Sequence, residues 1–164
     1  MGESHQQRVI VDASVLLALV LLDEPPNVRD GAWRLWWDII HGRVEAFVPD
    51  RFEDEVAGGL LRAIIRHRPM MMDVDWLFYQ IPFFGLNWCR WRDDWHPMDV
   101  WEVAKIAQCT YVDAIYVNLA LQLNATLWTA DGRLLRGLVA RRTTVAQLNG
   151  LQLGWIADYP TLVM

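Results

Sequence analysis

Four acidic side chains stand where a carboxylate could do chemistry. Asp12 interrupts the otherwise apolar run RVIVDASVLLALV, and Asp113 interrupts CTYVDAIYVNLALQL in the same way. Asp131 follows the apolar segment ATLWTA and precedes a helix-like segment, while Glu55 lies near the start of another helix-like segment. Because burial of an unpaired carboxylate is costly, Asp12 in particular needs a partner in the folded chain.

A cleft that brought these carboxylates together would need a positive charge. Like charges at close range disfavour ionisation unless a cation neutralises them. Hard divalent ions prefer oxygen ligands, and no cluster of His or Cys accompanies the acids. The residue types therefore indicate Mg²⁺ or Mn²⁺ and phosphoryl chemistry, in which the ion activates water for attack on a phosphate ester.

Each acid also has a simpler structural explanation. Asp131 precedes GRLL and could cap a helix or a turn. Glu55 and Asp113 could complement the dipole at the start of a helix. Asp12 is the hardest to explain in this way, because apolar segments flank it on both sides. From the pattern alone, a shared metal site and separate structural roles both stay open.

The order of segments predicts how the acids are positioned. Strand-like and helix-like stretches alternate, which is typical of an α/β fold with a mostly parallel central sheet flanked by helices. Strands are expected at residues 8–12, 44–49, 83–86, 125–131 and 143–148. Helices are expected at residues 13–22, 28–42, 50–68, 70–81, 98–109, 111–124 and 132–142. Ligands of such sheets bind at the carboxyl ends of the strands, so all four acids are expected at one edge.

Composition bounds the class of protein. The chain has 164 residues, of which 54% are hydrophobic and 21% charged, as is typical of a globular domain. No repeat or linker interrupts it, so we expect a single domain over residues 1–164, with a core at about 8–145 and a tail at 146–164 without a clear period. The net charge of -5 argues against nucleic-acid binding by bulk positive charge, although arginines could surround an acidic metal site.

The cysteines and the longest apolar run indicate the cellular compartment of the protein. Cys89 and Cys109 form no CxxC pair, and two such thiols suit a reducing cytosol. The run from Val9 to Leu22 is too short to span a bilayer and lacks a small-residue cleavage site. We therefore expect a cytoplasmic protein that does not insert into a membrane.

Four motifs together resemble the PIN-domain family, specifically the VapC-type ribonuclease toxins of toxin–antitoxin pairs. VIVDAS is similar to the family's apolar strand that ends in Asp, and VPDRFEDEVAGGLLR to a Pro followed six residues later by Glu. AKIAQC and YVDAIYVNLALQLNATLWTAD resemble the segments around the last two acids, which are 18 residues apart (131 − 113 = 18). The resemblance covers about residues 8–145, whereas the Trp-rich stretch 70–97 and the tail after residue 148 depart from it.

The resemblance also selects one acid from the consecutive Glu53, Asp54 and Glu55. At 100° per residue the three spread around the helix. The predicted buried stripe consists of Val56, Leu60, Ala63 and Ile64. Glu53 falls near the middle of that stripe and Glu55 on its flank, where a side chain could face a cleft. The six-residue offset from Pro49 selects Glu55 as well.

The resemblance implies a PIN-like three-layer fold and a Mg²⁺- or Mn²⁺-dependent endoribonuclease. The residues that would be both catalytic groups and ligands of one or two ions are Asp12, Glu55, Asp113 and Asp131. Ser14 and Thr129 would hold the carboxylates in place, although local capping explains these hydroxyls equally well. The implied partners are an RNA substrate, a small antitoxin protein and a second copy of the chain in a homodimer.

Arginines and tryptophans supply candidate interaction surfaces. The guanidinium group binds phosphate well, although solvated surface charge is the simpler explanation for a helix-surface Arg. The candidates for an RNA path are Arg62, Arg66, Arg68, Arg133 and Arg136. Trp33, Trp36 and Trp37 form a candidate partner surface, because aromatic residues are enriched at interfaces. Core packing is nevertheless expected for at least two of these three tryptophans.

Other classes of function compete with a ribonuclease. The first is a catalytically inactive PIN-like binding module that acts through a protein partner; a metal-dependent cleavage assay separates the two. A haloacid-type phosphatase would carry Asp-x-Asp after the first strand, where this chain has Asp12, Ala13 and Ser14. A receiver domain would carry a Lys near its end, whereas Lys105 is the single lysine here.

Overall fold

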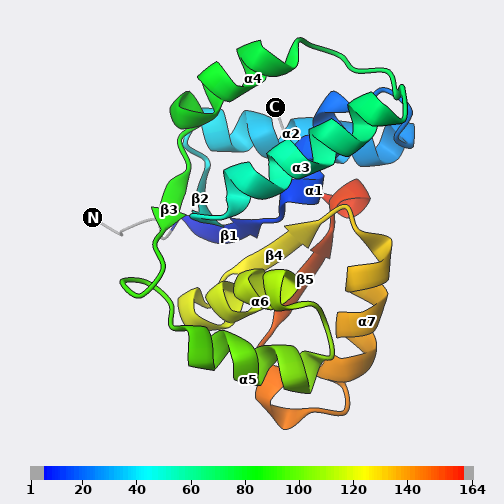
Figure 1. Ribbon diagram of the computed structural model, residues 1–164. Helices are drawn as coiled ribbons and strands as arrows, with labels where there is room; N and C mark the ends of the chain where they lie inside the picture. The colour runs from blue at the N-terminus through cyan, green and yellow to red at the C-terminus, as the bar shows by residue number, and fades with distance from the viewer. Residues whose placement is uncertain (1–5, 161–164) are drawn as a thin grey trace.

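The computed structural model describes residues 6–160 and arranges them in three layers, with helices on both faces of a five-stranded sheet (Figure 1). The strand order is β3-β2-β1-β4-β5, and all neighbouring strands are parallel. The strands are β1 (Gln7–Val11), β2 (Val44–Pro49), β3 (Asn87–Cys89), β4 (Thr126–Thr129) and β5 (Gln152–Trp155). The α/β class expected from the sequence is confirmed.

The helices from the first half of the chain cover one face of the sheet, and those from the second half cover the other face (Figure 1). The first group is α1 (Ala13–Val20), α2 (Pro26–Ile40), α3 (Phe52–Ile65) and α4 (Val74–Gln80). The second is α5 (Pro97–Ala107), α6 (Tyr111–Leu123) and α7 (Gly132–Arg142). Short 3-10 turns are η1 (Ile81–Phe83), η2 (Ala146–Leu148) and η3 (Ile156–Asp158). Within residues 6–160, no helix is long and apolar enough to cross a membrane.

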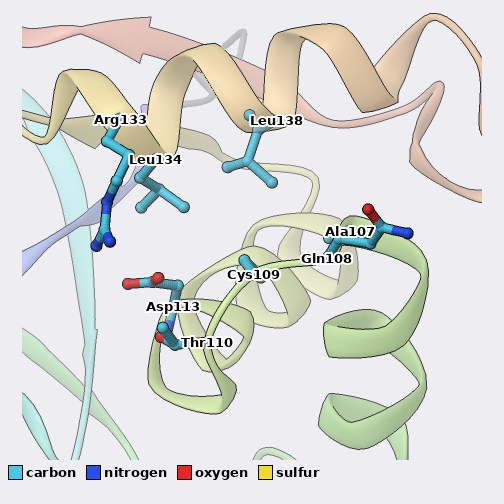
Figure 2. Close-up of a pocket in the computed structure, with 9 residues that line it drawn as sticks. Ala107, Gln108, Cys109, Thr110, Asp113, Arg133, Leu134 and Leu138 are labelled. Atoms are coloured by element: carbon cyan, nitrogen blue, oxygen red, sulfur yellow. The ribbon is translucent and has the colours of Figure 1, made fainter.

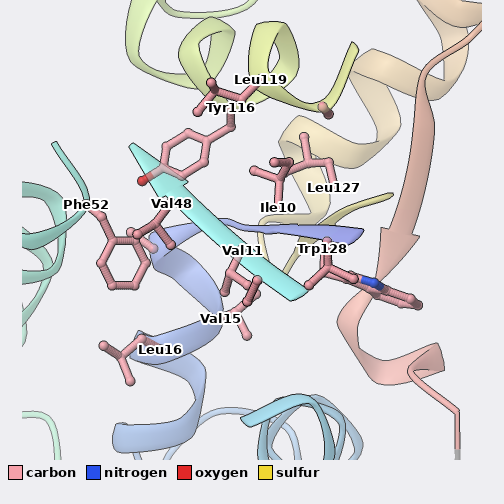
Figure 3. Close-up of a cluster of buried hydrophobic side chains, with 14 of the residues drawn as sticks. Ile10, Val11, Val15, Leu16, Val48, Phe52, Tyr116, Leu119, Leu127 and Trp128 are labelled. Atoms are coloured by element: carbon pink, nitrogen blue, oxygen red, sulfur yellow. The ribbon is translucent and has the colours of Figure 1, made fainter. Parts of the chain in front are cut away.

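The central strand β1 explains the apolar run in which Asp12 stands. Val9, Ile10 and Val11 are fully buried, because β1 lies between β2 and β4 and has a helix layer on each face. Figure 3 shows Val15 of α1 on one side of this strand and Leu119 of α6 on the other. A continuous β-branched segment is what a strand buried on both faces requires.

A close contact between α1 and α3 brings the first two predicted acids toward one cleft. Gly59 of α3 packs on the side chain of Leu17, and a Cβ atom at position 59 would lie 2.3 Å from a Leu17 methyl carbon. A larger residue would therefore have to displace the Leu17 side chain. The contact holds α3, with Glu55 in its first turn, beside α1 and the end of β1.

The third predicted strand is wrong in position. Residues 81–83 form the turn η1, and β3 begins only at Asn87, so that Trp88, expected in a loop, lies in the strand. Gly85 has a left-handed backbone with φ of 73°, which turns the chain before it enters the sheet. The apolar residues 83–86 therefore precede the strand.

The last predicted strand, residues 143–148, is also wrong. The hydroxyls of Thr143 and Thr144 donate to backbone carbonyls in the last turn of α7, and residues 146–148 form η2. The fifth strand is β5, inside the segment that showed no clear period. It contains Gly154, where a Cβ atom would lie 2.3 Å from the Trp128 ring. Residues 146–160 thus complete the sheet and belong to the core.

Smaller differences concern the ends of elements and the tryptophans of α2. β4 ends at Thr129 rather than at residue 131, and α3 ends at Ile65 rather than at residue 68. Trp36 is 2% exposed, whereas Trp33 is 53% and Trp37 37% exposed. The expectation that at least two of the three tryptophans pack in the core is wrong, because α2 has a broad face turned to solvent.

Candidate active site

Asp12 occupies the junction at which β1 ends and α1 begins. Its backbone N–H donates to the carbonyl of Trp128, 3.1 Å away on β4, and its carbonyl accepts from Val15 in the first turn of α1. The residue is only 6% exposed. The parallel pairing of β1 with β4 therefore fixes both the backbone of Asp12 and the neighbour that faces its side chain.

Two hydroxyl groups hold the Asp12 carboxylate. Ser14 Oγ and Thr129 Oγ1 both donate to Oδ2 of Asp12, the second over 2.6 Å. Within residues 6–160, no hydrogen bond reaches the other oxygen, Oδ1. These contacts agree with the positioning role expected for Ser14 and Thr129, and they leave one oxygen of Asp12 free to bind a ligand.

The same hydroxyls connect Asp12 to Asp131. Ser14 Oγ accepts a hydrogen bond from the backbone N–H of Ala130 (2.9 Å), and Thr129 Oγ1 accepts one from that of Asp131 (3.0 Å). Asp131 is the N-cap of α7, since its Oδ1 accepts from two backbone N–H groups of the first turn. The capping explanation therefore holds for one oxygen of Asp131, while its Oδ2 lies 3.7 Å from the Arg133 guanidinium.

Glu55 lies in the first turn of α3, and its pKa is raised above the usual value. Its Oε1 accepts a hydrogen bond from the hydroxyl of Tyr116, 2.7 Å away on α6. Burial, with the nearby negative charges of Asp12 and Asp113, raises the pKa of Glu55 to about 7 against the opposing effect of the Tyr116 bond. Near neutral pH this carboxyl group can thus hold or release a proton.

Asp113 lies in the first turn of α6, where Thr110 caps the helix by accepting from the backbone N–H of Asp113. A cleft of about 690 Å³ lies between the strand ends and the helices α3 and α6. All four predicted acids line it: Asp12, Glu55, Asp113 and Asp131. The structure therefore brings together the residues that the sequence placed at one edge of the sheet.

The buried charge of Asp12 shows why this cleft suits a cation. Burial raises the pKa of Asp12, the hydroxyls of Ser14 and Thr129 oppose that rise, and the negative charges of Asp113 and Asp131 add to it. A divalent ion with oxygen ligands would relieve this repulsion. The donor set, four carboxylates with a free oxygen on Asp12, therefore fits Mg²⁺ or Mn²⁺.

The side chains do not form a ready-made metal site. Across residues 6–160, no group of three or more His, Cys, Asp or Glu side chains is arranged so that it could hold a metal ion. Mutual repulsion disfavours the close approach of uncompensated carboxylates. The metal site thus stays a prediction, supported by the chemistry of the lining residues.

Sequence reasoning missed Tyr116, which is buried and bonds Glu55, and two residues that line the cleft. Tyr116 had no assigned role, although its i+3 spacing from Asp113 puts both on one side of α6. It is fully buried, and burial with the charge of Glu55 raises its pKa well above the usual value, so it stays a hydrogen-bond donor. Arg51 and Asp54 line the cleft, and no spacing rule singles them out.

The predicted arginines lie in three different settings. Arg62 lines the acidic cleft, and Arg62 and Arg66 line an adjoining hollow beside α1. Arg133 and Arg136 are exposed on α7. Arg68 is instead engaged in salt bridges with Asp23 (2.8 Å) and Glu24 (2.6 Å), which tie the end of α3 to the loop after α1. Its interpretation as an RNA-binding residue is replaced by a structural one.

Comparison with known proteins bears on the fold alone. No family model matches the chain, and no curated protein matches it. The crystal structure of PAE2754 from Pyrobaculum aerophilum is similar to this chain, with a TM-score of 0.55 and 21% sequence identity over 90% of each chain. At this level of identity, the similarity shows that the two chains share an α/β architecture along nearly their whole length.

Proposed function

We propose that this protein is a metal-dependent endoribonuclease that hydrolyses RNA phosphodiester bonds in the acidic cleft. The observation that carries the proposal is the lining of one cleft by four carboxylates at the carboxyl edge of a parallel sheet. The order and spacing of the motifs, which resemble those of PIN-domain ribonucleases of the VapC type, support it further. The acids lie where ligands of such sheets bind.

Each residue of the cleft has a distinct part in this proposal. Mg²⁺ or Mn²⁺, one or two ions, would supply an activated water and charge stabilisation. Asp12 would bind through Oδ1, while its Oδ2 stays fixed by Ser14 and Thr129. Glu55 would bind or move a proton with its orientation set by Tyr116. Asp113 and Asp131 would complete the ligand set.

Two measurements test the proposal together. Purified protein is incubated with end-labelled single-stranded RNA in Mg²⁺ or Mn²⁺ and, as the control, in EDTA. We expect cleavage only with the metal, and a melting temperature that rises with added Mn²⁺ because the ion binds the native state. A ligand at 100 times its Kd stabilises the native state by about 2.7 kcal/mol. Absence of both cleavage and a melting shift at millimolar metal would refute the metal site.

The exposed apolar side chains on α2 and α3 favour an additional role in protein binding. The set consists of Trp33, Trp37, Ile40, Leu61, Ile64 and Ile65. As the resemblance implies, a small antitoxin and a second copy of the chain are the partners proposed for these exposed side chains. Native mass spectrometry of the co-expressed neighbouring reading frame tests both. A partner complex without any metal-dependent cleavage would favour the alternative function, a catalytically inactive PIN-like binding module.

A further inference from the structure

A second pocket opens beside the acidic cleft, between α7 and the turn that joins α5 to α6 (Figure 2). Its volume is about 410 Å³, within the range of roughly 300–1,000 Å³ that is typical of small-molecule sites. Its walls come from α7 on one side and from Ala107, Gln108 and Cys109 on the other. The pocket thus has the volume of a small-molecule site.

The pocket is continuous with the acidic cleft. Thr110 and Asp113 line both hollows. Figure 2 shows the Asp113 carboxylate and the Arg133 guanidinium facing one another at the end of the pocket near that cleft. An RNA strand with one phosphate among the four acids would therefore place the adjoining nucleotide at the mouth of this pocket.

The walls match the surface of a nucleobase. Leu134 and Leu138 lie on the α7 side of the pocket, across from Cys109, and are 6% and 1% exposed, so they form the apolar floor of this side (Figure 2). Gln108 offers an amide that can both donate and accept, and Arg133 offers a planar cation. Unpaired bases bind proteins by stacking of their faces and by hydrogen bonds at their edges.

Gly137 keeps the α7 wall of the pocket open. It lines the pocket, and a Cβ atom built there would meet no heavy atom within 4 Å. Gly is a poor helix former, so local helix stability does not explain this residue in the middle of α7.

We propose that this pocket holds the base of a nucleotide next to the scissile phosphodiester, and that the RNA is unpaired at that nucleotide. The inference rests on the proposed function, because it takes the acidic cleft as the place where the phosphodiester is cut. A base paired in a duplex is stacked between its neighbours and could not enter the pocket. The enzyme is therefore expected to prefer certain bases at one position next to the cleaved bond.

The first test does not depend on RNA cleavage. Adenosine, cytidine, guanosine and uridine are titrated into the full-length protein and followed by the amide signals of Gln108 and Gly137 in NMR spectra. Nucleosides lack phosphate, so the acidic cleft and its metal do not contribute to their binding. We expect at least one nucleoside to shift these signals. Gly137→Leu, which adds a bulky side chain at the pocket lining, should weaken that binding at least about tenfold.

The matched control is Gly150→Leu. Gly150 lies in the turn before β5, and a Cβ atom there also meets nothing within 4 Å. This variant should bind nucleosides like the wild type. If no nucleoside shifts Gln108 and Gly137 up to its solubility limit, or if Gly137→Leu binds as well as Gly150→Leu, the proposal is wrong.

The second test uses oligoribonucleotides that vary in the bases on either side of the cut. We expect the wild type to discriminate at one of these positions, and Gly137→Leu to lose most of that discrimination while it still cleaves. Cleavage with unchanged base preference in Gly137→Leu would overturn the pocket assignment and leave the ribonuclease proposal standing. Absence of cleavage in the wild type would overturn the ribonuclease proposal and, with it, the place of the base beside a scissile phosphodiester. The nucleoside titration would then show separately whether the pocket binds a nucleobase.

Discussion

The acidic cleft has two walls of different construction. The strand-end wall, formed by Asp12, Ser14, Thr129 and Asp131, follows the adjacent strands β1 and β4 and is tied together by hydrogen bonds of 2.6 to 3.0 Å. The helix wall, formed by Glu55 and Asp113 with the fully buried Tyr116 bonded to Glu55, spans α3 and α6. Its two elements are joined across the wall by the bond of 2.7 Å between Tyr116 and Glu55.

This difference assigns different tasks to the two walls. Register between paired strands leaves little freedom, so Oδ1 of Asp12 has a fixed position before any ligand arrives. The helix wall depends on packing between α1 and α3, and its carboxyl group at Glu55 has a pKa of about 7. The strand-end wall therefore provides the fixed ligand, and the helix wall provides Glu55, whose charge can change near neutral pH.

The strongest test of the comparison is Asp12→Asn in the strand-end wall. The substitution removes the negative charge but keeps the size of the side chain. If Asp12 is the fixed ligand, kcat/KM for RNA cleavage should fall by roughly 10²–10³-fold, the usual cost of losing one preorganised electrostatic group. Cleavage of labelled RNA in Mn²⁺ measures the effect, and circular dichroism confirms the fold.

The control for Asp12→Asn is Asp93→Asn, because Asp93 is an exposed acid outside the cleft. It should cleave RNA at the wild-type rate. Cleavage by Asp12→Asn at nearly the wild-type rate would show that Asp12 is not a ligand, and the two walls would then have no difference in function.

The second prediction removes the support of Asp12 rather than its charge. Thr129→Val keeps the shape of a fully buried residue but deletes the hydroxyl that donates to Asp12 and accepts from the backbone of Asp131. Loss of such a supporting group costs metal affinity or activity about 10–100-fold. Isothermal titration with Mn²⁺ and the cleavage rate both measure it.

A matched control lies on the same strand. Thr126→Val deletes a hydroxyl that bonds Gln152 (3.2 Å) at the opposite end of β4, away from the cleft. It should leave metal affinity unchanged. Equal losses from Thr126→Val and Thr129→Val would mean that the strand, not the hydroxyl network, is what the activity requires.

The two walls also differ in what the sequence could predict. Asp12 and Asp131 follow apolar strands, so periodicity and the geometry of parallel sheets place them together without any family knowledge. Glu55 stands among three consecutive acids and was selected with the help of the resemblance. Its bond to Tyr116, 61 residues away, depends on how α3 and α6 pack, which no local pattern encodes.

The errors in the fold have equally local causes. The segment at 143–148 is rich in β-branched residues, but its threonine hydroxyls bond the end of α7. The observed last strand, β5, contains Gly154, where a side chain would overlap the Trp128 ring. Periodicity in the sequence does not reveal this contact. The salt bridges of Arg68 likewise join residues 44 or more apart in sequence.

The third prediction concerns pH and the helix wall. Because the folded-state pKa of Glu55 is raised from 4.5 to about 7, its protonated form favours the native state. That contribution is complete below about pH 4.5 and is lost as the pH rises through about 7. With allowance for partial exposure, we expect the free energy of unfolding in EDTA to fall by roughly 1–2 kcal/mol between pH 5 and pH 8. Urea titrations at several pH values measure it.

Two variants move this pH dependence in opposite directions. Glu55→Gln removes the titrating group and should flatten the slope. Tyr116→Phe removes the bond that favours the charged carboxylate, and so should steepen it. Saturating Mn²⁺ should flatten the wild-type slope, because a cation favours ionised carboxylates. An unchanged slope in Glu55→Gln would place the titration elsewhere, and the helix wall would lose its assigned adjustable charge.

The smallest effect is expected at the arginines beside the walls. Arg62 lines the cleft next to the helix wall, whereas Arg68 is paired with Asp23 and Glu24. Arg62→Ala should weaken RNA binding by about 2–5-fold and reduce the salt dependence by about one phosphate contact. Arg68→Ala should instead cost about 1 kcal/mol or less of stability and leave the salt dependence unchanged. Binding isotherms of a non-cleaved RNA analogue at several salt concentrations separate the two. The opposite result, a reduced salt slope in Arg68→Ala alone, would move the RNA path away from the helix wall, because a salt bridge that opens to bind phosphate would then be part of it.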